Sequence, residues 1–181
     1  GMGEIAAATQ AGVVLMHSRG SVEEMGTYCH ANYGEDVVAE ILAELGGSLT
    51  CALGAGVDRQ AIVLDPGIGF AKRSEHSLLV LAGLERLTSL GCAIMVGVSR
   101  KRFTGELSGV AIARDRVAGT VGANVAALMH GARLFRVHDV APNRQALDVA
   151  WGVIQAGYGA MNSDDSRPPG SQFPVPGSRR P

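Results

Sequence analysis

The sequence places groups that could bind a phosphorylated ligand directly after short apolar runs. Arg136 and His138 lie two residues apart in the segment RLFRVHDV. If this segment is a strand, both side chains project from one face, which is the geometry needed to hold one anion together. Arginine offers a planar fork of donors to phosphate oxygens, and a neighbouring histidine adds a donor whose proton can follow a leaving group. We therefore expect a diphosphate at this pair; a core histidine beside a surface arginine is the alternative.

The segment LDPGIGFAK, residues 64–72, places Asp65 at the end of another apolar run. The glycines after it let the backbone pass close to a flat ligand. A carboxylate there could accept two parallel hydrogen bonds from an amino-pyrimidinone edge, whereas an ordinary Asp-Pro-Gly turn is the structural alternative. Phe70 could add an aromatic contact or belong to the core.

The segment GVSRKRF, residues 97–103, predicts a site loop. We expect Lys101 to donate a hydrogen bond to a carbonyl on a heterocycle and Ser99 to add a smaller polar contact; a solvated lysine is the alternative. Three charges in one loop of a near-neutral protein are weak support for nucleic-acid binding. His17, Ser18 and Arg19 likewise follow an apolar run.

Several kinds of chemistry find no support in the sequence. The sequence shows no pattern of a nucleophile with a base and an orienting acid, and it contains no phosphate-binding GxxxxGK loop. The histidines lack metal-ligand spacing, so we expect no protein-held metal, and we interpret His30, His76 and His130 as surface or packing residues.

Composition and charge narrow the class of protein. The chain has 181 residues, of which 46% are apolar, and this composition predicts one globular domain. Its formal net charge of −1 argues against a basic face that would bind nucleic acid or anionic lipid. No apolar run reaches the roughly 18 residues that a bilayer span needs, and no signal peptide is recognisable. Cys29, Cys51 and Cys92 have no CxxC spacing, so we expect neither zinc nor disulfides and favour a reducing cytoplasm.

Four apolar runs predict the strands that position these groups. The strands are expected at residues 13–16, 61–64, 93–98 and 132–137, and helices at 35–45, 74–90, 114–129 and 141–156. Nearly continuous apolar runs are typical of strands covered on both faces, and the repeated strand-helix order favours an α/β fold with a parallel sheet. The polar groups would then share the carboxyl edge of that sheet.

Local signals refine these boundaries. Gly46 and Gly47 predict a kink or break in the helix that begins near Glu35, and Ser74 is expected to cap the next helix. The composition changes to a proline-rich run near Asn162, so we expect a domain over residues 1–157 and a disordered tail over 158–181.

Taken together, four segments resemble the successive carboxy-terminal strand motifs of dihydropteroate synthases. They are VVLMHSRG at 13–20, IVLDPGIGFAK at 62–72, VGVSRKRF at 96–103 and RLFRVHDV at 133–140. The resemblance implies a partial (β/α)8 TIM barrel, with about four carboxy-terminal βα units. It also implies a transferase of folate biosynthesis, which condenses 6-hydroxymethyl-7,8-dihydropterin diphosphate with p-aminobenzoate and releases diphosphate.

The resemblance assigns roles to the residues found above. It implies that Asp65 holds the pterin ring edge, that Lys101 contacts both the pterin and the p-aminobenzoate sides, and that Arg136 with His138 binds the diphosphate. Lys101, Arg136 and His138 are then catalytic groups that act by positioning and leaving-group stabilisation, without a covalent intermediate. The other pocket residues are Met16, Phe70, Gly97 and Ser99, with Arg100 in support.

The chain also departs from the family. The first four strands have no counterpart, nor does the magnesium-coordinating asparagine, so Mg²⁺ is expected to pair with the diphosphate alone. A complete barrel takes roughly 250 residues, so an open half-barrel predicts either truncation or pairing with a second copy or a complementing chain. Two alternatives remain: a non-catalytic pterin-binding or assembly module, and another pterin-binding barrel such as a methyltetrahydrofolate methyltransferase, which needs no diphosphate clamp.

Overall fold

The computed structural model describes the backbone of residues 1–161 and the side chains of residues 1–157. The strands are β1 (Val13–Met16), β2 (Ile62–Asp65), β3 (Ala93–Val96) and β4 (Leu134–Phe135). The α-helices are α1 (Met2–Thr9), α2 (Val37–Gly54), α3 (Ser74–Ala82), α4 (Arg102–Ser108), α5 (Val117–Met129) and α6 (Val140–Met161). Short 3-10 helices cover Arg59–Ala61, Leu84–Leu90 and Ala113–Asp115.

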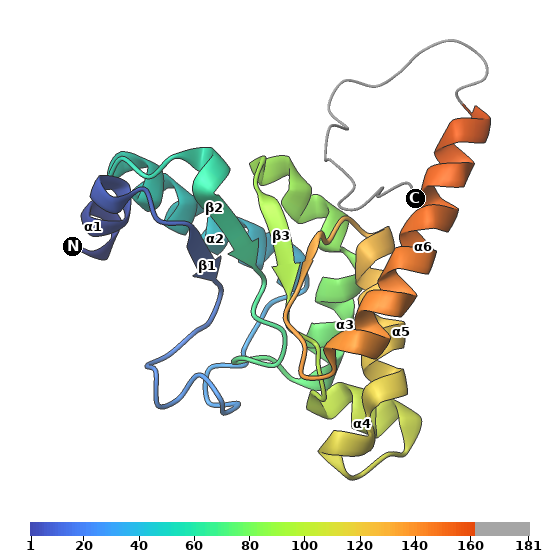
Figure 1. The fold of residues 1–181 in the computed structure, drawn as a ribbon. Coiled ribbons are helices and arrows are strands. Elements are labelled where there is room, and N and C mark those ends of the chain that lie inside the picture. The colour runs from blue at the N-terminus through green and yellow to red at the C-terminus, as the bar shows by residue number, and fades with distance from the viewer. Residues whose placement is uncertain (162–181) are drawn as a thin grey trace.

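The strands form a parallel sheet in the order β1-β2-β3-β4, of which Figure 1 labels β1, β2 and β3. Met16 lies opposite Asp65 in the register of β1 and β2, and Leu64 lies opposite Ile94 in that of β2 and β3. Because right-handed crossovers that all step in one direction place their helices on the same face, this order is that of a barrel segment and not of a doubly wound sheet. The predicted α/β fold with a parallel sheet is confirmed.

The two faces of the sheet differ in burial. On the helix-covered face, Leu64 is 0% exposed and Ile94 is 1% exposed. On the opposite face Val14 is 50% exposed, and Val63 and Met95 are only half-buried. The prediction that the strands are covered on both faces is therefore wrong within the described residues. The open inner face expected of an isolated half-barrel is present.

Helix α2 continues through Gly46 and Gly47, so the predicted break is wrong. Its buried stripe of Ile41 and Leu45 extends to Leu49 on the far side of the glycines, and this packing outweighs a cost of about 1 kcal/mol per glycine. By length and composition alone α2 could cross a membrane, but a core helix passes the same test. Its place in the hydrophobic core accounts for its apolar character.

Three other boundaries differ from the prediction. The helix expected over residues 74–90 divides at Gly83, where an added Cβ would lie 3.0 Å from Val38 Cγ2. Helix α3 starts at Ser74, but Arg73 occupies the N-cap position predicted for that serine. Helix α4 forms within and beyond the segment expected to be a loop.

The fourth strand is shorter than expected. It comprises only Leu134 and Phe135, so Arg136 follows the strand instead of lying within it. Helix α6 then runs to Met161, four residues beyond the predicted end of the domain. The rest of the predicted disordered tail, residues 162–181, lies outside the described residues.

The burial pattern predicts a contrast between two leucines. Leu64→Ala should lower the free energy of unfolding by about 2 to 5 kcal/mol, because the fully buried side chain leaves a cavity under the helices. Leu107→Ala, at a position that is 70% exposed, should change it by less than about 0.5 kcal/mol. Urea denaturation followed by circular dichroism measures both, and equal losses would contradict this placement of the core.

Candidate functional site

The residues that follow the strands meet at the carboxyl edge of the sheet, at the lower end of the strands in Figure 1. The backbone ladder continues past the strands, because the His17 N–H donates to the Asp65 carbonyl at 2.9 Å and the Arg136 N–H donates to the Val96 carbonyl at 3.0 Å. Met16, half-buried at the end of β1, is paired in register with Asp65. The fold therefore brings the predicted site residues to one edge.

Asp65 is a buried carboxylate close to several cations. Its side chain is 2% exposed, and its Oδ1 accepts the Gly67 N–H at 2.8 Å. Burial raises the pKa of Asp65, and the Gly67 hydrogen bond and the charges of Arg136, Lys72 and Lys101 oppose that rise. Three loops thus contribute positive charge to one buried acceptor.

Lys101 and Phe70 are brought together from different loops. The Lys101 Nζ lies 3.9 Å from the centroid of the Phe70 ring, within the range of a cation–π interaction. An added Cβ on Gly69 would lie 3.2 Å from Lys101 Cδ, so the glycine leaves room for the lysine stem. Burial lowers the pKa of Lys101, and the nearby Arg136 lowers it further. The ammonium is therefore held over an aromatic face at the edge that carries Asp65.

Arg136 and His138 lie against the loop that follows β3. An added Cβ on Gly97 would come within 2.9 Å of Arg136 Nη2, so the absence of a side chain lets the guanidinium cross this position. The His138 Nδ1 is 2.9 Å from the Ser99 hydroxyl, which also accepts the His138 N–H at 3.1 Å. Both basic side chains are exposed, so a ligand can reach them.

Arg100 is engaged within the protein. Its guanidinium makes two hydrogen bonds to the Asp139 carboxylate, at 3.0 and 2.7 Å, and its backbone N–H donates to the Thr120 hydroxyl at 3.0 Å. Arg116 donates to the carbonyl oxygens of Arg100 and Lys101. These contacts hold the loop after β3 against the loop after β4, so Arg100 supports the site.

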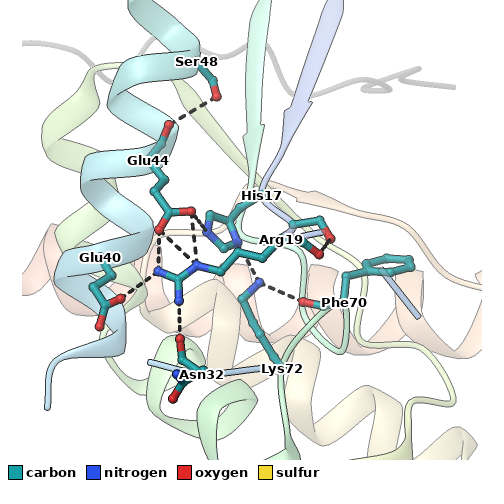
Figure 2. A network of polar contacts seen from close by, with 9 residues as sticks. His17, Arg19, Asn32, Glu40, Glu44, Ser48, Phe70 and Lys72 are labelled. Atoms are coloured by element: carbon teal, nitrogen blue, oxygen red, sulfur yellow. Dashed lines mark hydrogen bonds and ion pairs between the residues drawn. The ribbon is translucent and has the colours of Figure 1, made fainter. Parts of the chain in front are cut away.

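A polar network beside Asp65, in which His17 and Lys72 are buried, was missed by the sequence analysis (Figure 2). Lys72 is 1% exposed, and its Nζ donates to His17 Nδ1 at 2.8 Å and to the Phe70 carbonyl at 3.1 Å. His17 Nε2 lies 2.9 Å from a carboxylate oxygen of Glu44, which also pairs with Arg19. One feature of the sequence could have drawn attention to Lys72, because Lys72 and Lys101 are the only two lysines in the chain.

Burial sets the protonation of this network. Desolvation, followed by the charge of Lys72, lowers the pKa of His17 to about 4, and desolvation lowers the pKa of Lys72 to about 7. Hydrogen bonds from Arg19 lower the pKa of Glu44. His17 is therefore neutral near pH 7. Its partners assign the tautomer, with Nε2–H donating to Glu44 and Nδ1 accepting from Lys72.

Two hollows differ in size and chemistry. A cavity of about 150 Å³ is lined by Lys72, Lys101, Arg102 and Phe103, among others, and belongs to the site. A larger hollow of about 840 Å³ lies between β4 and α6, with Trp151 in its wall, and contains none of the predicted catalytic residues. Because the larger one lacks this chemistry, its size does not identify it as the site.

The described carboxylates do not form a magnesium site. Among residues 1–157, no group of three or more His, Cys, Asp or Glu side chains could hold a metal ion. Asp65 and Asp139 at the sheet edge lie beside cations, whereas Mg²⁺ requires several oxygen ligands in near-octahedral geometry. Cys29, Cys51 and Cys92 are free thiols. This donor set therefore does not fit a magnesium ion held by the protein.

Comparison with known proteins agrees with this geometry. The model of the family described as pterin binding enzyme matches residues 1–138. Dihydropteroate synthase from Mycobacterium leprae is 41% identical over 155 residues, which cover 82% of this chain and 54% of that protein. The inactive dihydropteroate synthase 2 of the same organism is 32% identical, over 84% of this chain and 53% of its own length. The chain thus spans about half the length of the curated relatives it matches.

A solved structure supports the same relationship. Dihydropteroate synthase from Xanthomonas albilineans in complex with 7,8-dihydropteroate matches with a TM-score of 0.76 and 40% sequence identity. The match covers 86% of this chain and 55% of that protein. Because the similar structures are TIM-barrel enzymes, the four βα units described above correspond to part of a (β/α)8 barrel.

The lowered pKa of Lys72 predicts how stability depends on pH. Its folded pKa of about 7 lies below its ordinary value of 10.5. Between about pH 7 and pH 10.5 the unfolded chain binds more protons than the folded chain, so the free energy of unfolding should rise with pH. Lys72→Met should remove the part of the rise that Lys72 contributes, on the order of 1 kcal/mol or more. Urea titrations of both proteins at several pH values test this, and parallel pH profiles would contradict it.

Proposed function

The chain belongs to the pterin binding enzyme family, and from this we propose that it carries part of a dihydropteroate synthase site for a pterin diphosphate and p-aminobenzoate. The observation that carries the proposal is the buried Asp65 carboxylate among Lys72, Lys101 and Arg136. Such an arrangement suits a ligand with a hydrogen-bonding ring edge at one end and a multiply charged anion at the other. A relative that binds 7,8-dihydropteroate, the condensation product, adds support.

Asp65 would recognise the pterin ring. A carboxylate must be ionised to accept two parallel N–H donors from an amino-pyrimidinone edge. Desolvation works against ionisation, whereas the nearby positive charges and the Gly67 N–H favour it. Lys101, held over the Phe70 ring, would donate to the ring carbonyl. The pair would fix both the register and the orientation of the heterocycle.

Arg136 and His138 would act on the diphosphate. In the proposed reaction the arylamine nitrogen forms a bond to the pterin methylene carbon, the bond from that carbon to the diphosphate oxygen breaks, and the nitrogen loses a proton. Negative charge gathers on the departing diphosphate, and a guanidinium placed there stabilises it more in the transition state than in the ground state. Catalysis then consists of positioning and leaving-group stabilisation, and the protein supplies no nucleophile.

Magnesium would have a limited role for this part of the site. Because Asp65 and Asp139 lie beside cations, the ion would have to be held by the diphosphate and by groups other than the described ones. When bound to the diphosphate, the ion would neutralise phosphate charge.

Further polypeptide is proposed to cover the open half-barrel. Strands β1 and β4 are the edges of the sheet, Val14 on the inner face is 50% exposed, and the hollow beside α6 is largely apolar. Exposed strand edges and apolar faces of this kind are usually covered. A second copy of the chain or a complementing chain would cover them. The protein would reside in the cytoplasm. A monomer whose edge-strand amides resist hydrogen exchange would contradict this arrangement.

A non-catalytic pterin-binding module is the second candidate. The observation that favours it is the similar relative named inactive dihydropteroate synthase 2, whose match covers nearly the same share of this chain as the match to the dihydropteroate synthase of the same organism. The two candidates differ in turnover. Formation of dihydropteroate from the pterin diphosphate and p-aminobenzoate, lost in Lys101→Ala, would establish the enzyme, whereas pterin binding without turnover would establish the module.

The diphosphate assignment predicts a selective effect of Arg136→Ala. The change should weaken binding of the pterin diphosphate by about 10- to 100-fold, the equivalent of one or two charge-assisted hydrogen bonds. Free pterin, which lacks the phosphates, should bind nearly as before. Isothermal titration calorimetry measures both, with Arg144→Ala on α6, where the guanidinium pairs with Asp148, as the control. An equal loss for the two ligands would show that Arg136 does not contact the diphosphate.

A further inference from the structure

Lys72 is an unusual residue to bury. It is 1% exposed, and none of the ion pairs formed among residues 1–157 includes it. Removing an ammonium from water costs several kcal/mol unless its hydrogen bonds are replaced, and methionine would fill a similar volume without that cost. Packing therefore does not explain the amine. Its two hydrogen-bond partners, the His17 ring and the Phe70 carbonyl, offer an explanation.

These two contacts join separate parts of the site. His17 directly follows β1, and Phe70 lies in the loop after β2. That loop contains Gly67 at φ 66° and Ala71 at φ 44°, a left-handed conformation that residues with a Cβ seldom adopt. A methyl at Gly67 would overlap the His17 carbonyl oxygen, so the loop passes close to the end of β1. A conformation of this kind needs ties from outside the loop, and the Lys72 amine provides one.

The network behind Lys72 is anchored to the core. His17 Nε2 is held by Glu44 on α2, and the Arg19 guanidinium pairs with the same carboxylate and with Glu40 at 2.7 Å (Figure 2). Arg19 also stacks over the Tyr33 ring at 4.0 Å. Because α2 contributes many of the buried core residues, this chain of contacts connects the Lys72 amine to a rigid part of the molecule.

The loop that Lys72 holds presents the aromatic face beneath Lys101. The Phe70 carbonyl accepts from Lys72, while the Phe70 ring lies 3.9 Å from Lys101 Nζ. We propose that Lys72 is a positioning residue, which fixes the Phe70 loop against His17 and thereby sets the ring that holds the Lys101 ammonium in place. The significance of this for catalysis rests on the proposed function of Lys101, but the geometric claim can be tested without it.

The lysine content of the chain makes a direct test possible. Because Lys72 and Lys101 are its only lysines, selective ¹³C labelling of lysine gives two sets of ε-methylene NMR signals, and Lys72→Met and Lys101→Met assign them. The Lys101 protons should be shifted upfield by the ring current of Phe70, and Phe70→Leu should abolish that shift. In folded Lys72→Met we expect the shift to fall by at least half. Arg114→Met, which changes a side chain that is 78% exposed, should leave it unchanged.

A second variant keeps the test decisive if Lys72→Met fails to fold. Glu44→Ala leaves both lysines in place but removes the oxygen that accepts from His17 Nε2, and it should lose part of the Lys101 shift. An unchanged Lys101 shift in folded Lys72→Met, or in Glu44→Ala if the first variant unfolds, would overturn the proposal. Adding pterin diphosphate to the unchanged protein is a separate measurement. A Lys101 signal that does not change when the ligand is added would count against the proposed function and would leave the positioning role of Lys72 untouched.

Discussion

The buried Asp65 carboxylate, surrounded by positive charge, is the interaction on which the rest of the site depends. Burial alone would favour its neutral form, and Arg136, Lys72 and Lys101 oppose that effect. Two of these cations follow β3 and β4, and the third closes the loop after β2. A parallel sheet brings the loops that follow its strands to one edge, and the sequential order places β2, β3 and β4 beside one another, so the topology and the electrostatics of the site are parts of the same constraint.

Close approach of the loops requires particular residues. Gly67 has a positive φ and no room for a side chain beside His17, and Gly97 leaves space for the Arg136 guanidinium. Arg100, itself at φ 59°, is held by its pair with Asp139. These local costs are offset by hydrogen bonds between loops, so the binding groups are positioned before any ligand arrives.

The sequence predicted the elements and the polar residues that follow the strands better than it predicted the connections between those residues. Asp65 and Lys101 could be identified because each follows an apolar run. Lys72 and Glu44 could not, because their partnership with His17 joins residues that are 55 and 27 positions apart, and only the tertiary fold brings them together. The helix break expected at Gly46 is absent for a related reason, because the packing of α2 outweighs the low helix propensity of glycine. The second face of the sheet was predicted as covered because apolar runs do not reveal which face has a partner.

Titration of the chain and of Asp65→Asn with the pterin diphosphate in a calorimeter shows whether the Asp65 carboxylate holds the ring edge. Asparagine keeps the size of the side chain and an oxygen that can accept the Gly67 N–H, but it lacks the charge and the second acceptor for the ring edge. We expect the chain to bind the ligand and the variant to bind it about tenfold or more weakly while remaining folded. Equal affinities, or no binding by the unchanged chain, would show that Asp65 does not have this role.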